Sequence, residues 1–162
     1  MTRHEEMQAF VRYYKRINKK TAVSMAEVAV AAISEGWPEP PPVSGVERLA
    51  KQFSDAEREE IRHDQKTKHP YRANLAITER LKDGKQRALW IDTDEADREQ
   101  MIFAMAKYRE QMIGEAVIGT NTVNHWNRVH PDQLPLPFDT DLKEEVQWRL
   151  NAPPDDEDEK AG

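Results

Sequence analysis

Apolar and polar positions alternate with a two-residue period in one part of the chain, from Tyr71 to Asp92. This period predicts two β-strands, with the Asp83-Gly84 pair as the turn between them. A three-residue loop with a left-handed Gly84 aligns the two apolar faces, whereas a two-residue turn would mismatch them. In this register Leu75 lies opposite Ile91, Ile77 opposite Leu89 and Ala76 opposite Trp90, and Ala73 extends the buried face. We therefore expect a β-hairpin over about residues 71–92.

Elsewhere the apolar positions recur every three or four residues, which is typical of amphipathic helices. Several predicted helices begin with a serine followed three positions later by a glutamate. The predicted helices cover residues 5–18, 24–34, 44–53, 54–66, 95–118, 122–129 and about 141–150. Asp94 is the predicted cap of the longest one, and the Gly119-Thr120-Asn121 segment is predicted to interrupt it. The pattern indicates a mainly α (α+β) fold with five to seven helices around one hairpin.

Proline interrupts the helical pattern most strongly at residues 38–42, where four of five residues are proline. Proline lacks a backbone donor and restrains the residue before it, so this segment is predicted to be an extended connector. It is either a ligand for a proline-recognising domain or a rigid spacer between helices, which is the commoner use.

Two predicted helices within residues 44–66, followed by a hairpin, are similar in order to a winged helix. The analogy covers residues 44–92 and rests on element order, with no specific motif. The turn between the two helices lacks the expected glycine, and Glu57, Glu59 and Glu60 would repel phosphate. The second helix could therefore be a solvated surface helix instead of a DNA-reading one.

The length of 162 residues favours one domain, residues 1–152, followed by an acidic disordered tail, residues 153–162. The net charge of −6 is unevenly distributed: residues 1–92 hold 17 basic and 14 acidic residues, and residues 93–162 hold 7 and 16. A basic first half is expected of a nucleic-acid face, and chance surface patterning also produces such a split. The sequence has no apolar run of membrane length and no signal peptide, so we expect a cytoplasmic protein without a membrane partner.

Few residues are arranged for catalysis or metal binding. His125 and His130 are five positions apart, whereas metal ligands on one helix face need a spacing of three or four. The segment 124–127 superficially resembles part of an HNH nuclease, but the strand-turn-helix context of that motif is missing. Cysteine, a P-loop and a dinucleotide fingerprint are also missing from the sequence. We expect a non-enzymatic protein with no metal and no cofactor.

Two functions remain as hypotheses. The first is a small DNA-binding or regulatory protein that uses the hairpin as a wing. Its phosphate contacts would be Arg80, Lys82, Lys85 and Arg87, helped by Lys66, Lys68 and Arg72.

The second hypothesis is a protein-interaction or dimerisation module built on the helix at residues 95–118. Its partner surface would be one helical stripe: Met101, Met105, Tyr108 and Met112. Such stripes more often line a domain core, so burial of the stripe within one chain is the discriminating observation. The acidic tail is expected to be either a passive solubilising end or a competitor for the anionic partner of the hairpin.

Overall fold

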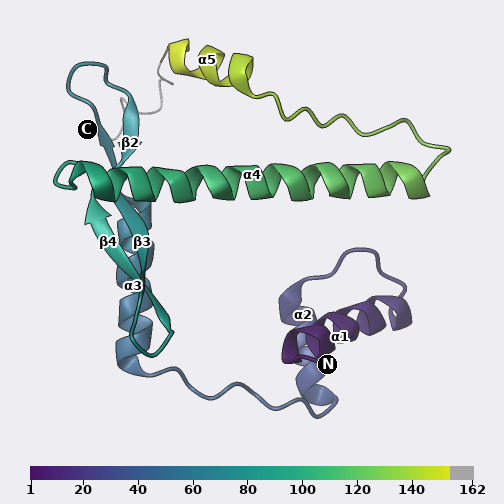
Figure 1. The fold of residues 1–162 in the computed structure, drawn as a ribbon. Coiled ribbons are helices and arrows are strands. Elements are labelled where there is room, and N and C mark those ends of the chain that lie inside the picture. Colours follow the sequence, from purple (N-terminus) through teal and green to yellow (C-terminus); the bar gives the residue numbers. More distant parts are fainter. Residues whose placement is uncertain (154–162) are drawn as a thin grey trace. The chain divides into compact units, whose positions relative to one another are not determined.

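A computed structural model describes residues 1–153, which combine helices with two small antiparallel sheets (Figure 1). This part of the chain has five helices and four strands, so the expected mixture of helix and sheet is confirmed, with two hairpins in place of one. The chain divides into two units, residues 1–48 and residues from 49 onward, which are described separately. A single domain over 1–152 stays a prediction. The predicted acidic tail, from residue 154 onward, lies outside the described residues.

The first unit contains helices α1 (Arg3–Ile17) and α2 (Met25–Ser34). Thr2 caps α1 in a reciprocal capping box, and Ser24 caps α2 as predicted. After α2 the chain turns at Gly36, whose φ of +94° lies in the left-handed region that favours glycine. The ring of Trp37 then reaches back to Phe10, with 5.3 Å between ring centroids. Arg3 also lies over the Trp37 ring at 4.4 Å, and Lys20 pairs with Glu27 at 3.3 Å, so several contacts join α1 to α2 and the residues around it.

The predicted helix pair in residues 44–66 is wrong. One continuous helix, α3 (Gly45–Glu59), passes through Ser54, and the chain then forms strand β1 (Ile61–His63) paired with β2 (Pro70–Arg72). The loop between these strands is held by Asp64, whose Oδ1 accepts the backbone N–H groups of Lys66 and Thr67 at 2.9 and 2.8 Å. A helix-turn-helix is therefore not formed here, and the winged-helix arrangement is not confirmed.

The predicted hairpin register is confirmed by strands β3 (Asn74–Arg80) and β4 (Gln86–Asp92). Leu75 pairs with Ile91, Ala76 with Trp90 and Ile77 with Leu89. Gly84 has a φ of +82°, and the Gly84 N–H donates to the Leu81 carbonyl at 3.0 Å, which closes the expected three-residue loop. The hairpin begins at Asn74 instead of Tyr71 because residues 70–72 pair with β1.

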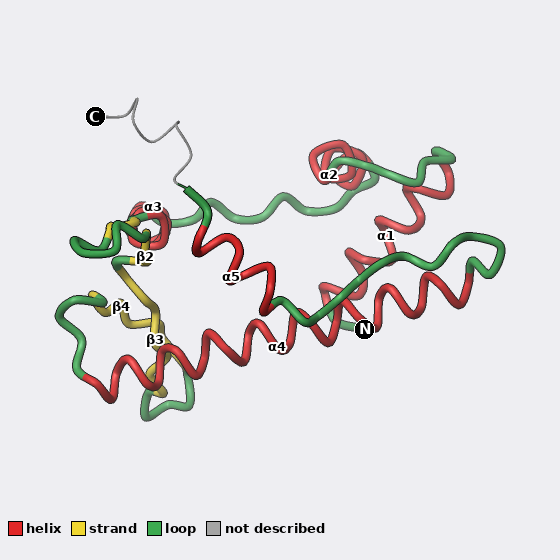
Figure 2. Tube along the Cα trace, turned by 90° about the horizontal axis from the view of Figure 1, so that it is seen from above, coloured by secondary structure: helices red, strands yellow, loops and turns green. Residues whose placement is uncertain are grey.

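A single long helix, α4 (Arg98–Val129), follows the hairpin (Figures 1 and 2). Its cap is Asp97, in a capping box with Gln100, and not the predicted Asp94. The predicted interruption at Gly119 is also wrong. A helical glycine costs only about 1 kcal/mol, which an already long helix tolerates. The Thr120 hydroxyl also bonds back to the Ala116 carbonyl at 2.8 Å.

Beyond α4 an extended segment, residues 131–142, here called the arm, leads to the last helix, α5 (Lys143–Asn151). Figures 1 and 2 both show the arm doubling back along the carboxyl-terminal half of α4. The N-cap residue of α5 is Leu142, which makes no side-chain cap hydrogen bond, but Asp141, one of the two predicted caps, accepts the backbone N–H of Lys143 at 3.3 Å. Within the described residues, the buried apolar side chains are only Val28, Ala73 and Ala104. The chain thus leaves most of its apolar side chains without a core.

Candidate interaction surface

Four residues of α4 form a continuous apolar stripe, here called the methionine row: Met101, Met105, Tyr108 and Met112. A helix turns about 100° per residue, so steps of four, three and four keep these side chains within about 60° of one another. Three of them are exposed, Met105 at 48%, Tyr108 at 42% and Met112 at 54%. Met101 is half-buried, so within the second unit the methionine row lies mostly on the surface.

The same stripe continues toward the carboxyl end of α4, where the arm covers it. Phe138 lies so close to Gly119 that a Cβ added to the glycine would be 2.6 Å from the ring. About two turns further along α4, the Asn127 side-chain oxygen accepts the backbone N–H of Leu136 at 2.9 Å. Gly119 therefore permits the close approach of an aromatic ring, a role that differs from the helix break expected of it. The arm leaves the methionine row uncovered.

Strand β3 packs against a different side of α4. Ala104 is buried there, and the Lys107 ammonium donates to the Thr78 hydroxyl at 2.8 Å. At 100° per residue, Ala104 and Lys107 lie on average about 100° around the helix from the methionine row. The contact with the hairpin therefore leaves Met105 and Met112 uncovered, while Tyr108 lies at its edge and lines the cavity beside β3.

Exposed apolar side chains also surround the rest of α4. The exposed large apolar residues of this helix are Ile102, Phe103, Met105, Tyr108, Met112, Ile113, Val117, Ile118 and Val129. A helix that is apolar on most sides is normally buried in a protein or an assembly. Between Met101 and Ile118 the helix carries two basic and two acidic residues, so its net charge there is zero. Two copies of this segment would not repel each other.

A network of ion pairs joins the two hairpins and includes Asp94, in the turn that leads to α4. Arg62 on β1 contacts both Asp92 oxygens at 3.0 and 2.9 Å and reaches Asp94 at 2.8 Å. Hydrogen bonds from Arg62 lower the pKa of Asp92, and the same pairs raise the pKa of Arg62. The Tyr71 hydroxyl donates to Asp94, which raises the pKa of the tyrosine. Asp94 is thus used as an acceptor in this network and not as a helix cap.

The hairpin tip carries the four predicted phosphate ligands, Arg80, Lys82, Lys85 and Arg87, and all four are exposed. Arg87 pairs with Glu79 across the strands at 2.6 Å. Within the described residues, the other three cations make no ion pair. The structure therefore brings the four tip residues together and leaves three of their charges uncompensated.

The supporting cations, Lys66, Lys68 and Arg72, belong to the other hairpin. Lys66 and Lys68 lie in the β1–β2 loop, which points away from the hairpin tip in Figure 1. Arg72 donates to the Arg58 carbonyl at 3.3 Å and lines a cavity beside α4. The seven predicted nucleic-acid contacts are thus divided among the β3–β4 tip, the β1–β2 loop and the cavity beside α4.

Sequence reasoning missed the contact between Gly119 and Phe138 and the network around Arg62. A glycine within an otherwise apolar helical pattern was a usable indication of a close contact, but nothing in the pattern names the residue that approaches it. The partners of Arg62 are 30 and 32 residues away, so no local pattern predicts them.

Residues 1–153 contain neither a metal-binding cluster nor a membrane-spanning helix. No group of three or more histidine, aspartate or glutamate side chains there is placed to hold a metal ion. Across the same residues, none of the helices has both the length and the apolar character needed to cross a bilayer. Comparison with known proteins gave no match to a family model, a curated protein or a solved structure. Function must therefore be argued from the surfaces of the chain itself.

Proposed function

We propose that this chain is a self-associating interaction module in which α4 of one copy packs along α4 of another through the methionine row. The observation that supports the proposal is the exposure of Met105, Tyr108 and Met112 on the most continuous apolar stripe of the second unit. Each large apolar side chain gains about 1.5–3 kcal/mol when it leaves water. An uncovered stripe is thus a strong driving force for association.

The properties of α4 favour a second copy of the chain as the partner. Steps of four and three residues along the methionine row match the spacing with which two helices interdigitate. The helix has 32 residues, which corresponds to a length of about 48 Å at 1.5 Å per residue. The zero net charge from Met101 to Ile118 adds no repulsion between identical copies. Methionine side chains adapt to an imperfect facing surface.

Sedimentation velocity across a dilution series tests this proposal on the whole chain. A dimer that dissociates on dilution is expected. Because the sequence has no cysteine, a single Met105→Cys substitution places one thiol in the methionine row. Under mild oxidation it should form a disulfide between chains. Asn121→Cys is the matched control because this exposed residue lies about 160° around the helix from Met105. A monomer at every concentration, or equal crosslinking of both variants, would rule the dimer out.

A second candidate function, DNA binding through the hairpin tip, is favoured by the three tip cations without ion pairs. The set Arg80, Lys82, Lys85 and Arg87 suits contact with phosphates more than with bases, so affinity should depend steeply on salt. Gel-shift titrations at low and moderate ionic strength test it. Replacement of the four tip residues by glutamine should abolish the low-salt complex. Binding that is unaffected by this replacement, or no binding at low salt, would eliminate the candidate.

A further inference from the structure

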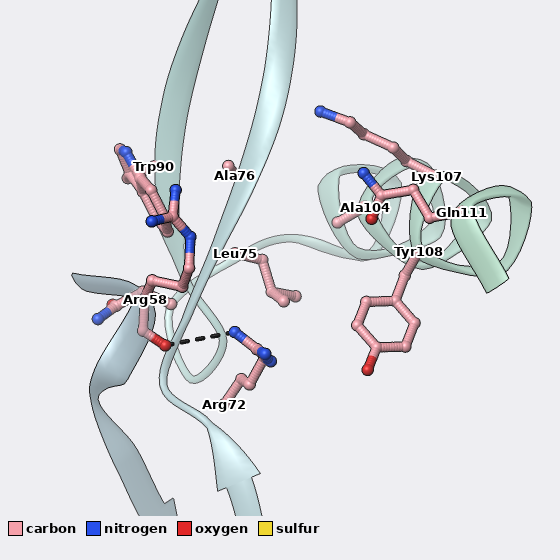
Figure 3. A pocket seen from close by; sticks show the side chains of 10 residues that line it. Arg58, Arg72, Leu75, Ala76, Trp90, Ala104, Lys107, Tyr108 and Gln111 are labelled. Carbon is pink, nitrogen blue, oxygen red and sulfur yellow. Dashed lines mark hydrogen bonds between the residues drawn. The ribbon is translucent and has the colours of Figure 1, made fainter. Parts of the chain in front are cut away.

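A cavity of about 380 Å³ lies where the end of α3, the β3–β4 hairpin and α4 meet (Figure 3). Its lining includes three cationic side chains, Arg58, Arg72 and Lys107, and two aromatic ones, Trp90 and Tyr108. In the view of Figure 3, Arg58 and Trp90 lie on one side of β3, and the α4 residues Lys107 and Tyr108 lie on the other. The volume is within the range of about 300–1,000 Å³ common for small-molecule sites.

The charge of this cavity is one-sided, because no aspartate or glutamate lines it. Arg58 already pairs with Asp55 at 3.0 Å. Arg72 and Lys107 differ from it: within residues 1–153 their polar contacts are to neutral oxygens, the Arg58 carbonyl at 3.3 Å and the Thr78 hydroxyl at 2.8 Å. Two positive charges therefore remain without a carboxylate partner at the same cavity. Such an arrangement attracts an anion.

The aromatic side chains restrict the shape of that anion. The Arg58 guanidinium lies 5.7 Å from the ring centroid of Trp90, so that ring is held in place beside a cation. Rings of Trp90 and Tyr108 offer flat apolar surface, and flat ligands stack on such surface. Asn74, which is buried, also lines the cavity, and its amide group is held by Glu60 at 2.8 Å. The hairpin end of the cavity is thus preformed.

We propose that this cavity binds a small ligand made of a planar ring and an anionic group, either a carboxylate or a phosphate. Arg72 and Lys107 would hold the anionic group by charge-assisted hydrogen bonds, and Trp90 and Tyr108 would contact the ring. This site is separate in chemistry from the methionine row, since it depends on charge. Tyr108 belongs to both, so assembly through the row could alter the affinity of the cavity.

An NMR titration of the full chain, monitored through the tryptophan indole NH signals, tests the site. The Trp90→Phe variant assigns the Trp90 signal. Benzoate and AMP are the carboxylate and phosphate probes, and benzamide and adenosine are their neutral counterparts. A saturable shift of the Trp90 signal is expected with at least one anion, and the matching neutral compound should bind at least about tenfold more weakly. Binding of one probe only identifies the anionic group. Equal binding of charged and neutral compounds, or no binding up to about 10 mM, overturns the proposal.

Variants then distinguish a specific binding site from non-specific attraction of the anion to a basic surface. Arg72→Gln and Lys107→Gln should each weaken binding of the anion by about fivefold or more. Arg80→Gln is the control, because it removes an exposed cation of the same unit that does not line the cavity. Equal loss in all three variants would show non-specific attraction and overturn the proposal. If a glutamine variant fails to fold, the comparison of charged and neutral probes on the unchanged chain still decides.

Discussion

The β3–β4 hairpin and helix α4 differ in how far their apolar side chains are covered within the chain. The hairpin pairs its strands with each other, and Leu75, Ile77 and Ile91 are all at least half-buried within the chain. Helix α4 has more than four times as many residues as either strand, and nine of its large apolar side chains are exposed. A strand finds its partner across a short loop, whereas a helix satisfies its own hydrogen bonds and leaves its apolar face for a distant element. The exposed apolar face of α4 is the observation that the proposed self-association would account for.

The largest effect is expected from placing charge on the methionine row. The double substitution Met105→Glu and Met112→Glu should convert a dimer into a monomer. Burial of one such side chain contributes about 1.5–3 kcal/mol, so losing two from each chain should weaken association by well over about 100-fold. Sedimentation velocity measures this change.

The matched control for that variant is Asn121→Glu, which adds a charge to an exposed position on the far side of α4. This variant should associate like the unchanged chain. Circular dichroism should show that both proteins keep the helical content of the parent. If the control dissociates as readily as the methionine variant, net charge and not the methionine row controls association.

The turn of the β3–β4 hairpin depends on Gly84, whose φ is +82°. A side chain in the left-handed region costs about 1–2 kcal/mol, so Gly84→Ala should destabilise the second unit by that amount. Urea unfolding followed by Trp90 fluorescence, in a chain whose other tryptophans are replaced by phenylalanine, reports on this unit. Gly45→Ala is the control, because Gly45 begins α3 without a positive φ and with open space around it. Equal destabilisation by both substitutions would show that the turn conformation is not the cause.

The register of the hairpin could be predicted because everything that determines it is local. Residues within the strands alternate, and Gly84 sets the loop length. The first hairpin was missed for the opposite reason. Residues 54–66 have an adequate helical pattern, but Arg62 reaches Asp92 and Asp94 from a strand, and that interaction joins residues far apart in sequence. Tertiary contacts overrode a local preference.

The candidate interaction surface, the methionine row, could be predicted only in part from the sequence. Its four residues and their shared face could be read from the spacing alone. The spacing could not show whether the row lies in a core or on a surface, because buried and exposed helical stripes have the same spacing. The answer depended on where β3 and the arm contact α4, which involves residues as far apart as Thr78 and Phe138.

Two glycines of α4 allow a sharper test of which parts of the helix are already covered. Gly114 has open space around it, whereas a Cβ at Gly119 would be 2.6 Å from the Phe138 ring. Gly114→Ala should stabilise the chain by about 1 kcal/mol through helix propensity. In Gly119→Ala the same gain is opposed by displacement of Phe138, so the net change should be smaller or of opposite sign. Thermal unfolding of both variants measures the difference.

Release of the arm provides a second measurement for these glycine variants. Chymotrypsin should cleave after Phe138 faster in Gly119→Ala than in Gly114→Ala, because a displaced ring is easier to reach. Equal cleavage rates and equal stabilities would show that the arm does not hold Phe138 against α4.

The smallest expected effect is the acid sensitivity of the network that joins the hairpins. Hydrogen bonds from Arg62, followed by the backbone N–H of Asp94, hold the pKa of Asp92 below its ordinary value of 3.8. A lowered folded-state pKa contributes stability above the unfolded pKa of 3.8, and that stability is lost as pH falls through the folded value. Backbone hydrogen bonds from Thr67 and Lys66 lower the pKa of Asp64 and add a change of the same sign. Because Asp64 is exposed and Asp92 is partly exposed, the effect should be modest. The urea midpoint of the second unit should therefore decrease between about pH 5 and about pH 3, and Asp92→Asn should reduce the decrease without abolishing it. A midpoint independent of pH over this range, or an unchanged slope in Asp92→Asn, would show that the Arg62 pair does not stabilise the junction between the hairpins.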